Sequence, residues 1–236
     1  MPLTFSDFSP VGLAFEIRYP DAYLLWDHAG QMSQELREIH EITRLVSADP
    51  GKIAFIAEGT REVSWSLGSM IVLDHRPRNS AFESFFTLCK DCFEIATRNL
   101  SVSELKRVGF RPTFSKNFPS KEEAVAALLS TGLLYTPAGK NFNVEPAGRY
   151  PEYAIRCEDE KFGYLLRLVV QEINYEFEPP PQWMGNVVDP THEQRLTLDI
   201  DYYSRAAIAV GSLNVSEWLA QVTHAIRRDA DSYLAR

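Results

Sequence analysis

Residues 62–114 read EVSWSLGSMIVLDHRPRNSAFESFFTLCKDCFEIATRNLSVSELKRVGFRPTF, and this stretch decides the fold that the sequence predicts. Apolar residues alternate with polar ones over 63–73, which predicts a long strand with a bulge or strong bend at Gly68-Ser69. A capping box then opens a helix over residues 80–98. A second strand follows over 105–114, so the stretch predicts a strand–helix–strand unit.

A similar order of elements closes the chain. Strands are predicted over residues 153–157, 162–177 and 195–203, and Asn214 caps a final long helix. The polar pair Gln171-Glu172 predicts a bulge in the second of these strands. Each half of the chain therefore holds about three antiparallel strands followed by one long helix.

These two units predict an α+β fold, in which one or two antiparallel sheets carry long helices on one face. We expect a first α+β half over residues 1–135 and a second over 152–236. The loop 136–151 joins them, and they pack together as one unit. A duplicated strand-meander-plus-helix unit is the first interpretation. A single curved sheet around the last helix is the alternative.

The composition argues against several classes of protein. The chain has 236 residues, with 24 Lys and Arg against 32 Asp and Glu, and a net charge of −8. No basic block is present, so we do not expect a nucleic-acid partner. The N-terminus lacks a signal-peptide pattern, and no run reaches the roughly 18 apolar residues of a membrane span. The three cysteines are typical of reduced thiols. We therefore expect a cytoplasmic protein with no membrane contact.

Cys89 and Cys92 match the C-x-x-C spacing, but they fall in the middle of a predicted helix on its apolar face. A redox pair needs a thiol exposed at a helix N-terminus, where its pKa falls. We therefore expect two buried thiols. No second cysteine pair completes a zinc site, and no cofactor is expected.

Asp199 and Asp201 form the candidate metal or catalytic pair. They project from the same face of a strand, a spacing that suits a divalent cation or acid–base chemistry. A metal would need further ligands, and Glu172 and Glu176 on the preceding strand are the candidates. The alternative is an ordinary solvated strand face, which the alternation favours.

Arg107 and Arg111 form a second charged pair on a strand face and are candidate binding residues. Two roles are open for them. They meet an anionic ligand, or they pair with carboxylates of a neighbouring strand. Cross-strand pairing of opposite charges is the more common arrangement.

The segment 178–193 is a predicted loop in which three prolines, Pro179-Pro180-Pro181, precede Trp183 and Met184. Consecutive prolines favour the extended polyproline II conformation. Such a loop can present the two apolar side chains to a protein partner. The alternative is that Trp183 folds back over the sheet as a lid.

Three short segments carry a family resemblance: KRVGFR at 106–111 after a long helix, LDID at 198–201, and Trp218 in a helix near the C-terminus. In these features the chain resembles an uncharacterised, sporadically distributed prokaryotic family of proteins of similar length, over most of its residues. The resemblance implies a soluble α+β fold and brings no known activity or functional residues. The patchy distribution implies an accessory protein with an interaction or defence role, in which a toxin is one conceivable partner.

Three functions follow from these observations. The first is a non-catalytic interaction protein that presents a sheet face or the proline-rich loop to a protein partner, in an oligomeric state left open. The second is a small-ligand-binding protein whose pocket, between curved sheet and helices, is lined by Trp65, Phe110 and Tyr202. The third is a metal-dependent hydrolase that uses Asp199 and Asp201. The first is preferred because the sequence contains no catalytic motif.

Overall fold

The computed structural model describes residues 3–75, 77, 82–134, 150–175 and 191–234. Their fold is a large antiparallel sheet of nine strands with long helices on one face, so the predicted α+β class is confirmed. The candidate residues Trp183 and Met184 lie outside the described residues, as does most of the predicted loop 136–151.

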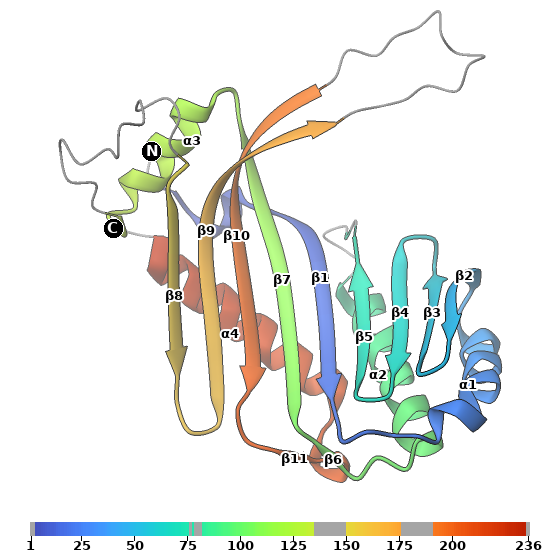
Figure 1. Cartoon of the computed structure of the whole chain (residues 1–236). Coiled ribbons are helices and arrows are strands. Elements are labelled where there is room, and N and C mark those ends of the chain that lie inside the picture. The colour runs from blue at the N-terminus through green and yellow to red at the C-terminus, as the bar shows by residue number, and fades with distance from the viewer. Residues whose placement is uncertain (1–2, 76, 78–81, 135–149, 176–190, 235–236) are drawn as a thin grey trace, which may run out of the picture.

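The sheet consists of two meanders that flank two central strands, β1 (Ser9–Arg18) and β7 (Arg107–Phe118). The first meander comprises β2 (Ile42–Asp49), β3 (Lys52–Ala57), β4 (Arg61–Ser66) and β5 (Ser69–Asp74). The second comprises β8 (Glu152–Glu158), β9 (Phe162–Tyr175) and β10 (Thr191–Ser204). The order across the sheet is β2-β3-β4-β5-β1-β7-β10-β9-β8 (Figure 1). A separate small sheet pairs β6 (Glu104–Leu105) with β11 (Ile208–Ala209). The division of the chain into two halves at 136–151 stays a prediction.

The helices are α1 (Leu25–Ile39), α2 (Phe82–Asn99), α3 (Lys121–Ser130) and α4 (Val215–Leu234). Each meander is followed in the chain by a long helix, α2 after the first and α4 after the second. The short helix α3 begins after an N-cap serine, because the Ser120 hydroxyl accepts from the Glu123 N–H at 3.2 Å. It packs against β7, β9 and β10.

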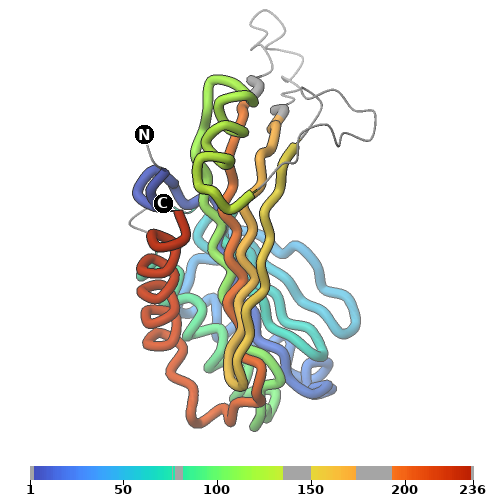
Figure 2. Tube along the Cα trace, turned by 90° about the vertical axis from the view of Figure 1, so that its left-hand side faces the viewer, coloured from blue at the N-terminus to red at the C-terminus, as the bar shows by residue number. Residues whose placement is uncertain are grey.

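The main core lies between the sheet and the long helices. Phe15, Phe110 and Tyr202 are cross-strand neighbours on β1, β7 and β10, so they share one face of the sheet. Phe85 of α2 contacts Phe110 with ring centroids 6.4 Å apart. Trp218 of α4 contacts Phe15 and Tyr202 with ring centroids 6.3 and 6.2 Å away. Figure 2 shows α4 on one side of the strands.

The prediction of one long, bulged strand over residues 63–73 is wrong, because these residues form a hairpin of β4 and β5. Trp65 pairs with Met70 across this hairpin. The Ser66 hydroxyl accepts from the Ser69 N–H at 3.1 Å, and the Tyr19 hydroxyl donates to the carbonyls of both serines at 2.9 Å. Serine and glycine at such a position form a tight turn, which the alternating pattern alone did not reveal.

The predicted bulge at Gln171-Glu172 is also wrong. Gln171 pairs with Arg195 and Glu172 with Gln194 in an uninterrupted register between β9 and β10. Side-chain hydrogen bonds satisfy the polar groups of these two residues. Gln171 accepts from the Thr197 hydroxyl at 2.9 Å, and Glu172 accepts from the Tyr150 hydroxyl at 3.0 Å. The strand therefore keeps its regular pleat.

Candidate functional site

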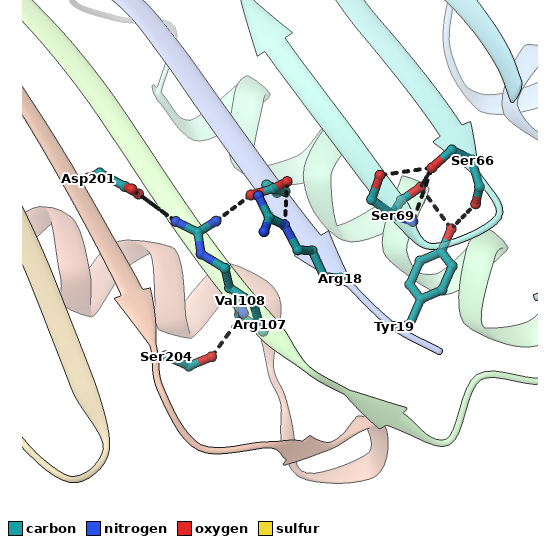
Figure 3. A network of polar contacts seen from close by, with 9 residues as sticks. Arg18, Tyr19, Ser66, Ser69, Arg107, Val108, Asp201 and Ser204 are labelled. Atoms are coloured by element: carbon teal, nitrogen blue, oxygen red, sulfur yellow. Dashed lines mark hydrogen bonds and ion pairs between the residues drawn. The ribbon is translucent and has the colours of Figure 1, made fainter. Parts of the chain in front are cut away.

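The sheet face opposite α1, α2 and α4 carries all four charged residues that the sequence singles out. Arg107 donates from Nη2 to both Asp201 oxygens at 2.9 and 3.0 Å, and its Nη1 contacts Glu16. Arg111 donates to Asp199 through Nε and Nη2 at 2.7 and 2.6 Å. Figure 3 shows Arg107 of β7 extended toward Asp201 of β10. The expected pairing of the arginines with carboxylates of neighbouring strands is confirmed.

Two glycines allow the side chains on this face to lie flat. A Cβ at Gly109 would come within 2.5 Å of Arg107 Nη1, and a Cβ at Gly163 would come within 2.8 Å of Tyr203 Cζ. The Arg107 guanidinium stands 5.1 Å from the centroid of the Tyr203 ring. The Tyr203 hydroxyl in turn donates to Glu158 at 2.5 Å. Glycine is therefore required at both positions for these contacts to form.

The ion pairs decide what this face can do chemically. Asp199 holds the pKa of Arg111 above its usual value through their hydrogen bonds. Asp199 and Asp201 each already bind a guanidinium, which favours a structural role over metal binding for them. Glu172 binds Tyr150, and Glu176 lies outside the described residues. Within the described ranges, no three His, Cys, Asp or Glu side chains gather as metal ligands would.

A second polar cluster lies on the helix-covered face and was missed in the sequence. His40, at the end of α1, has Nδ1 2.8 Å from Glu58 and Nε2 2.9 Å from Asp91 of α2. The two ring nitrogens of His40 therefore connect the β3–β4 turn, through Glu58, to α2, through Asp91.

Arg61 extends this cluster across the first meander. Its Nε donates to Asp74 at 3.0 Å, its Nη2 donates to Ser84 at 2.7 Å, and its Nη1 contacts Glu58. The side chains of Arg61 and His40 are each only 7% exposed. The cluster thus ties α1 and α2 to the β3–β4 and β4–β5 hairpins. No local sequence signal reveals it, because its members are far apart in the chain.

Cys89 and Cys92 are buried free thiols on α2, as the sequence predicts. Burial raises the pKa of both thiols well above the usual value. For Cys92 the nearby carboxylates of Asp91 and Glu58 act in the same direction. Neither thiol is in the exposed, electropositive setting of a reactive cysteine.

Trp65, Phe110 and Tyr202, which were expected to line one ligand pocket, lie in different surroundings. Trp65 and Phe110 are fully buried in the core. Tyr202 lines a cavity between β9, β10 and α4 that has a volume of about 30 Å³ and involves neither of them. A pocket for an organic ligand is typically about 300–1,000 Å³, so this cavity has room for little more than water.

The largest exposed aromatic side chains described lie at the start of α1. Trp26 is 60% exposed and Tyr23 is 58% exposed, and their rings meet edge to face with centroids 5.4 Å apart. Large exposed apolar groups in contact with one another are typical of interaction surfaces. The sequence contained a signal for Trp26, because it falls outside the apolar stripe of Leu25, Met32 and Leu36 that α1 buries.

Trp26 borders a groove between α1 and the β2–β3 hairpin, which we call the α1 groove. It consists of two adjoining hollows of about 580 and 430 Å³ that share Ala48 and Ile53. The first includes Trp26, Ala29, Asp49, Pro50 and Lys52, and the second includes Gly30, Gln34, Arg37, Leu45 and Phe55. The first hollow is largely apolar and has Asp49 and Lys52 as its charged residues, whereas the second is lined by both polar and apolar side chains and includes Arg37.

Comparison with protein-family models and with curated proteins finds no match to this chain. The family resemblance drawn from residues 106–111 and 198–201 therefore stays a prediction. None of the described helices is both long and apolar enough to cross a membrane.

Proposed function

We propose that this protein is a non-catalytic protein-interaction component, and that the α1 groove binds a helix of its partner. The observation that carries the proposal is the exposed Trp26 ring, which lines the largely apolar first hollow of the groove and contacts the exposed Tyr23 ring. Tryptophan and tyrosine are the residues most enriched among those that dominate interface affinity. A reducing, cytoplasmic location is part of the proposal and is supported by the three free cysteines.

The shape of the groove favours a helix as its occupant. The α1 residues that line it run from Leu25 to Arg37, a length of about 18 Å at the helical rise of ~1.5 Å per residue. That length matches about three turns of a partner helix lying alongside, the arrangement in which an amphipathic helix inserts apolar anchors into a groove.

The geometry of β2 argues against strand addition by a partner at this edge of the sheet, the edge beside the α1 groove. The pairing of β2 with β3 shifts register between Ile42 and Arg44 and again between Leu45 and Ser47. Bulges of this kind twist an edge strand and discourage further pairing. Docking of side chains into the groove is therefore better supported than strand addition.

A selection experiment tests this function. A phage-displayed library of amphipathic helical peptides is selected against the wild-type protein and against Trp26→Ala. Leu129→Ala serves as the matched control, because Leu129 is an exposed apolar residue on α3, away from the groove. We expect peptides that bind wild type and Leu129→Ala alike but bind Trp26→Ala about 30-fold more weakly, the loss typical of a truncated anchor.

Three outcomes contradict the proposal. Peptides that bind Trp26→Ala as tightly as wild type would place binding elsewhere, and a selective loss in Trp183→Ala would favour the proline-rich loop. A small molecule retained by the purified protein in native mass spectrometry would favour the ligand-binding alternative instead.

A further inference from the structure

The α1 groove has two ends of unlike character. Trp26 and Asp49 stand at one end, and Arg37 and Leu45 stand at the other. Lys52 is the cross-strand partner of Asp49, so it partly offsets the acidic charge at the first end. No described contact pairs the Arg37 guanidinium with a carboxylate, which leaves the second end with an exposed cation.

Gly30 lies between these ends, in the interior of α1. No described atom stands within 4 Å of where its Cβ would be, so packing among the described residues does not explain the glycine. Glycine in a helix interior costs about 1 kcal/mol relative to alanine. A bare backbone at an exposed helix position instead permits close approach of another chain.

The two ends of the α1 groove would be complementary to each other in a dimer with two-fold symmetry. An axis near Gly30 would lay two α1 helices antiparallel and bring the end of the groove with Trp26 and Asp49 in one copy to the end with Arg37 and Leu45 in the other. Each favourable contact would then occur twice, as it does in every isologous dimer. The face of α1 that lines the groove carries the exposed Trp26, so α1 of a second copy would supply an aromatic anchor.

We propose that a second copy of this chain occupies the α1 groove, forming a two-fold dimer in which the α1 helices cross at Gly30. This inference rests on the proposed function, because it names the partner for the same surface. In the dimer each Trp26 ring would bury itself beside Leu45 of the second copy. Each Arg37 would gain Asp49 of the second copy as an ion-pair partner.

Sedimentation velocity of the full chain over a wide range of concentration tests the dimer. We expect reversible dimerisation of the wild type. Gly30→Gln should abolish it, because the added side chain fills the crossing point. Ala126→Gln makes a comparable addition at an exposed position of α3 and should dimerise as the wild type does. Circular dichroism should show no loss of thermal stability in Gly30→Gln, since glutamine is a better helix former than glycine.

A charge exchange tests the orientation of the two copies. Arg37→Asp and Asp49→Arg should each weaken the dimer by about tenfold, and the double variant should recover most of the loss. A dimer that neither these variants nor Gly30→Gln affects would overturn the proposed interface, because its contacts would then lie elsewhere.

A wild-type protein that stays monomeric at the highest attainable concentration would overturn the inference as well. The peptide selection then separates the two failures. Peptides that depend on Trp26 would show that the groove binds a different helix, so only the second copy would be wrong. If the protein is monomeric and the selection also yields no such peptides, both the dimer and the proposed function are wrong.

Discussion

Glu58 shows how a single residue combines an unfavourable backbone conformation with a required side chain. It has a φ of 48° and Gly59 has a φ of 81°, both in the left-handed region, in the turn of residues 58–60 between β3 and β4. Asparagine or glycine is favoured at the position that Glu58 occupies. Its carboxylate, however, contacts both His40 and Arg61.

Replacement of Glu58 by asparagine separates these two effects. Glu58→Asn relieves the backbone but removes an acceptor from two side chains that are almost fully buried. We expect a net destabilisation of about 1–3 kcal/mol, the usual cost of a buried polar group left short of a partner. Urea unfolding measures it, and Thr60→Asn in the same turn is the control. A variant more stable than wild type would show that the turn, and not the cluster, limits stability.

The cysteines provide a second test at the scale of single residues. An alkylating reagent should modify Cys157, which is only partly buried, well before Cys89 and Cys92. The raised pKa of the two buried thiols lowers their thiolate fraction at any given pH, and burial blocks the reagent. Mass spectrometry of the labelled protein should show one adduct in the native state and three after denaturation. Rapid native labelling of Cys89 and Cys92 would contradict their place in the core.

At the scale of elements, Arg107 joins three strands that are distant in the chain. It lies on β7 and binds Glu16 of β1 and Asp201 of β10. Gly109 makes this possible, because the guanidinium lies where a Cβ at position 109 would be. The glycine and the arginine therefore act as one unit, although sequence patterns treat them as separate residues.

A double-mutant cycle measures this coupling. Gly109→Ala should displace Arg107 and cost about 1 kcal/mol, and Arg107→Ala should cost a similar amount, as partly exposed pairs usually do. If the glycine acts through the arginine, the two losses should not add, and Gly109→Ala should be nearly neutral in the Arg107→Ala background. Thermal unfolding of the four proteins gives the cycle. Additive losses would mean that Gly109 acts on its own.

At the scale of the whole molecule, the sequence predicted the elements better than their connections. The alternation around Asp199 and Arg111 predicted that both lie on an outward face. Opposite charges on neighbouring strands commonly pair, so their ion pair could be predicted. The hairpin at Gly68 was missed because two strands with a tight turn and one bulged strand give similar alternation. His40 was missed because Glu58 and Asp91 approach it only through tertiary packing.

The candidate site illustrates the same limit. The residues that α1 buries, Leu25, Met32 and Leu36, recur at helical spacing and are predictable from periodicity, whereas Ile39 at the helix end is exposed. The α1 groove depends on how the β2–β3 hairpin lies beside α1. That arrangement depends on contacts among elements that periodicity does not encode.

The position of β1 in the middle of the sheet has a consequence for synthesis of the chain. Phe15 of β1 pairs with Val72 of β5 on one side and with Phe110 of β7 on the other. The strand β1 therefore leaves the ribosome first and is synthesised long before β7, its second neighbour. The first meander can assemble early, because its hairpins are local. Until β7 emerges, β1 exposes an unpaired apolar edge, and until β10 emerges, β7 does the same. Such high contact order slows folding and prolongs exposure to aggregation. A nascent chain of this topology therefore depends on rapid completion or on a chaperone that shields the central strands.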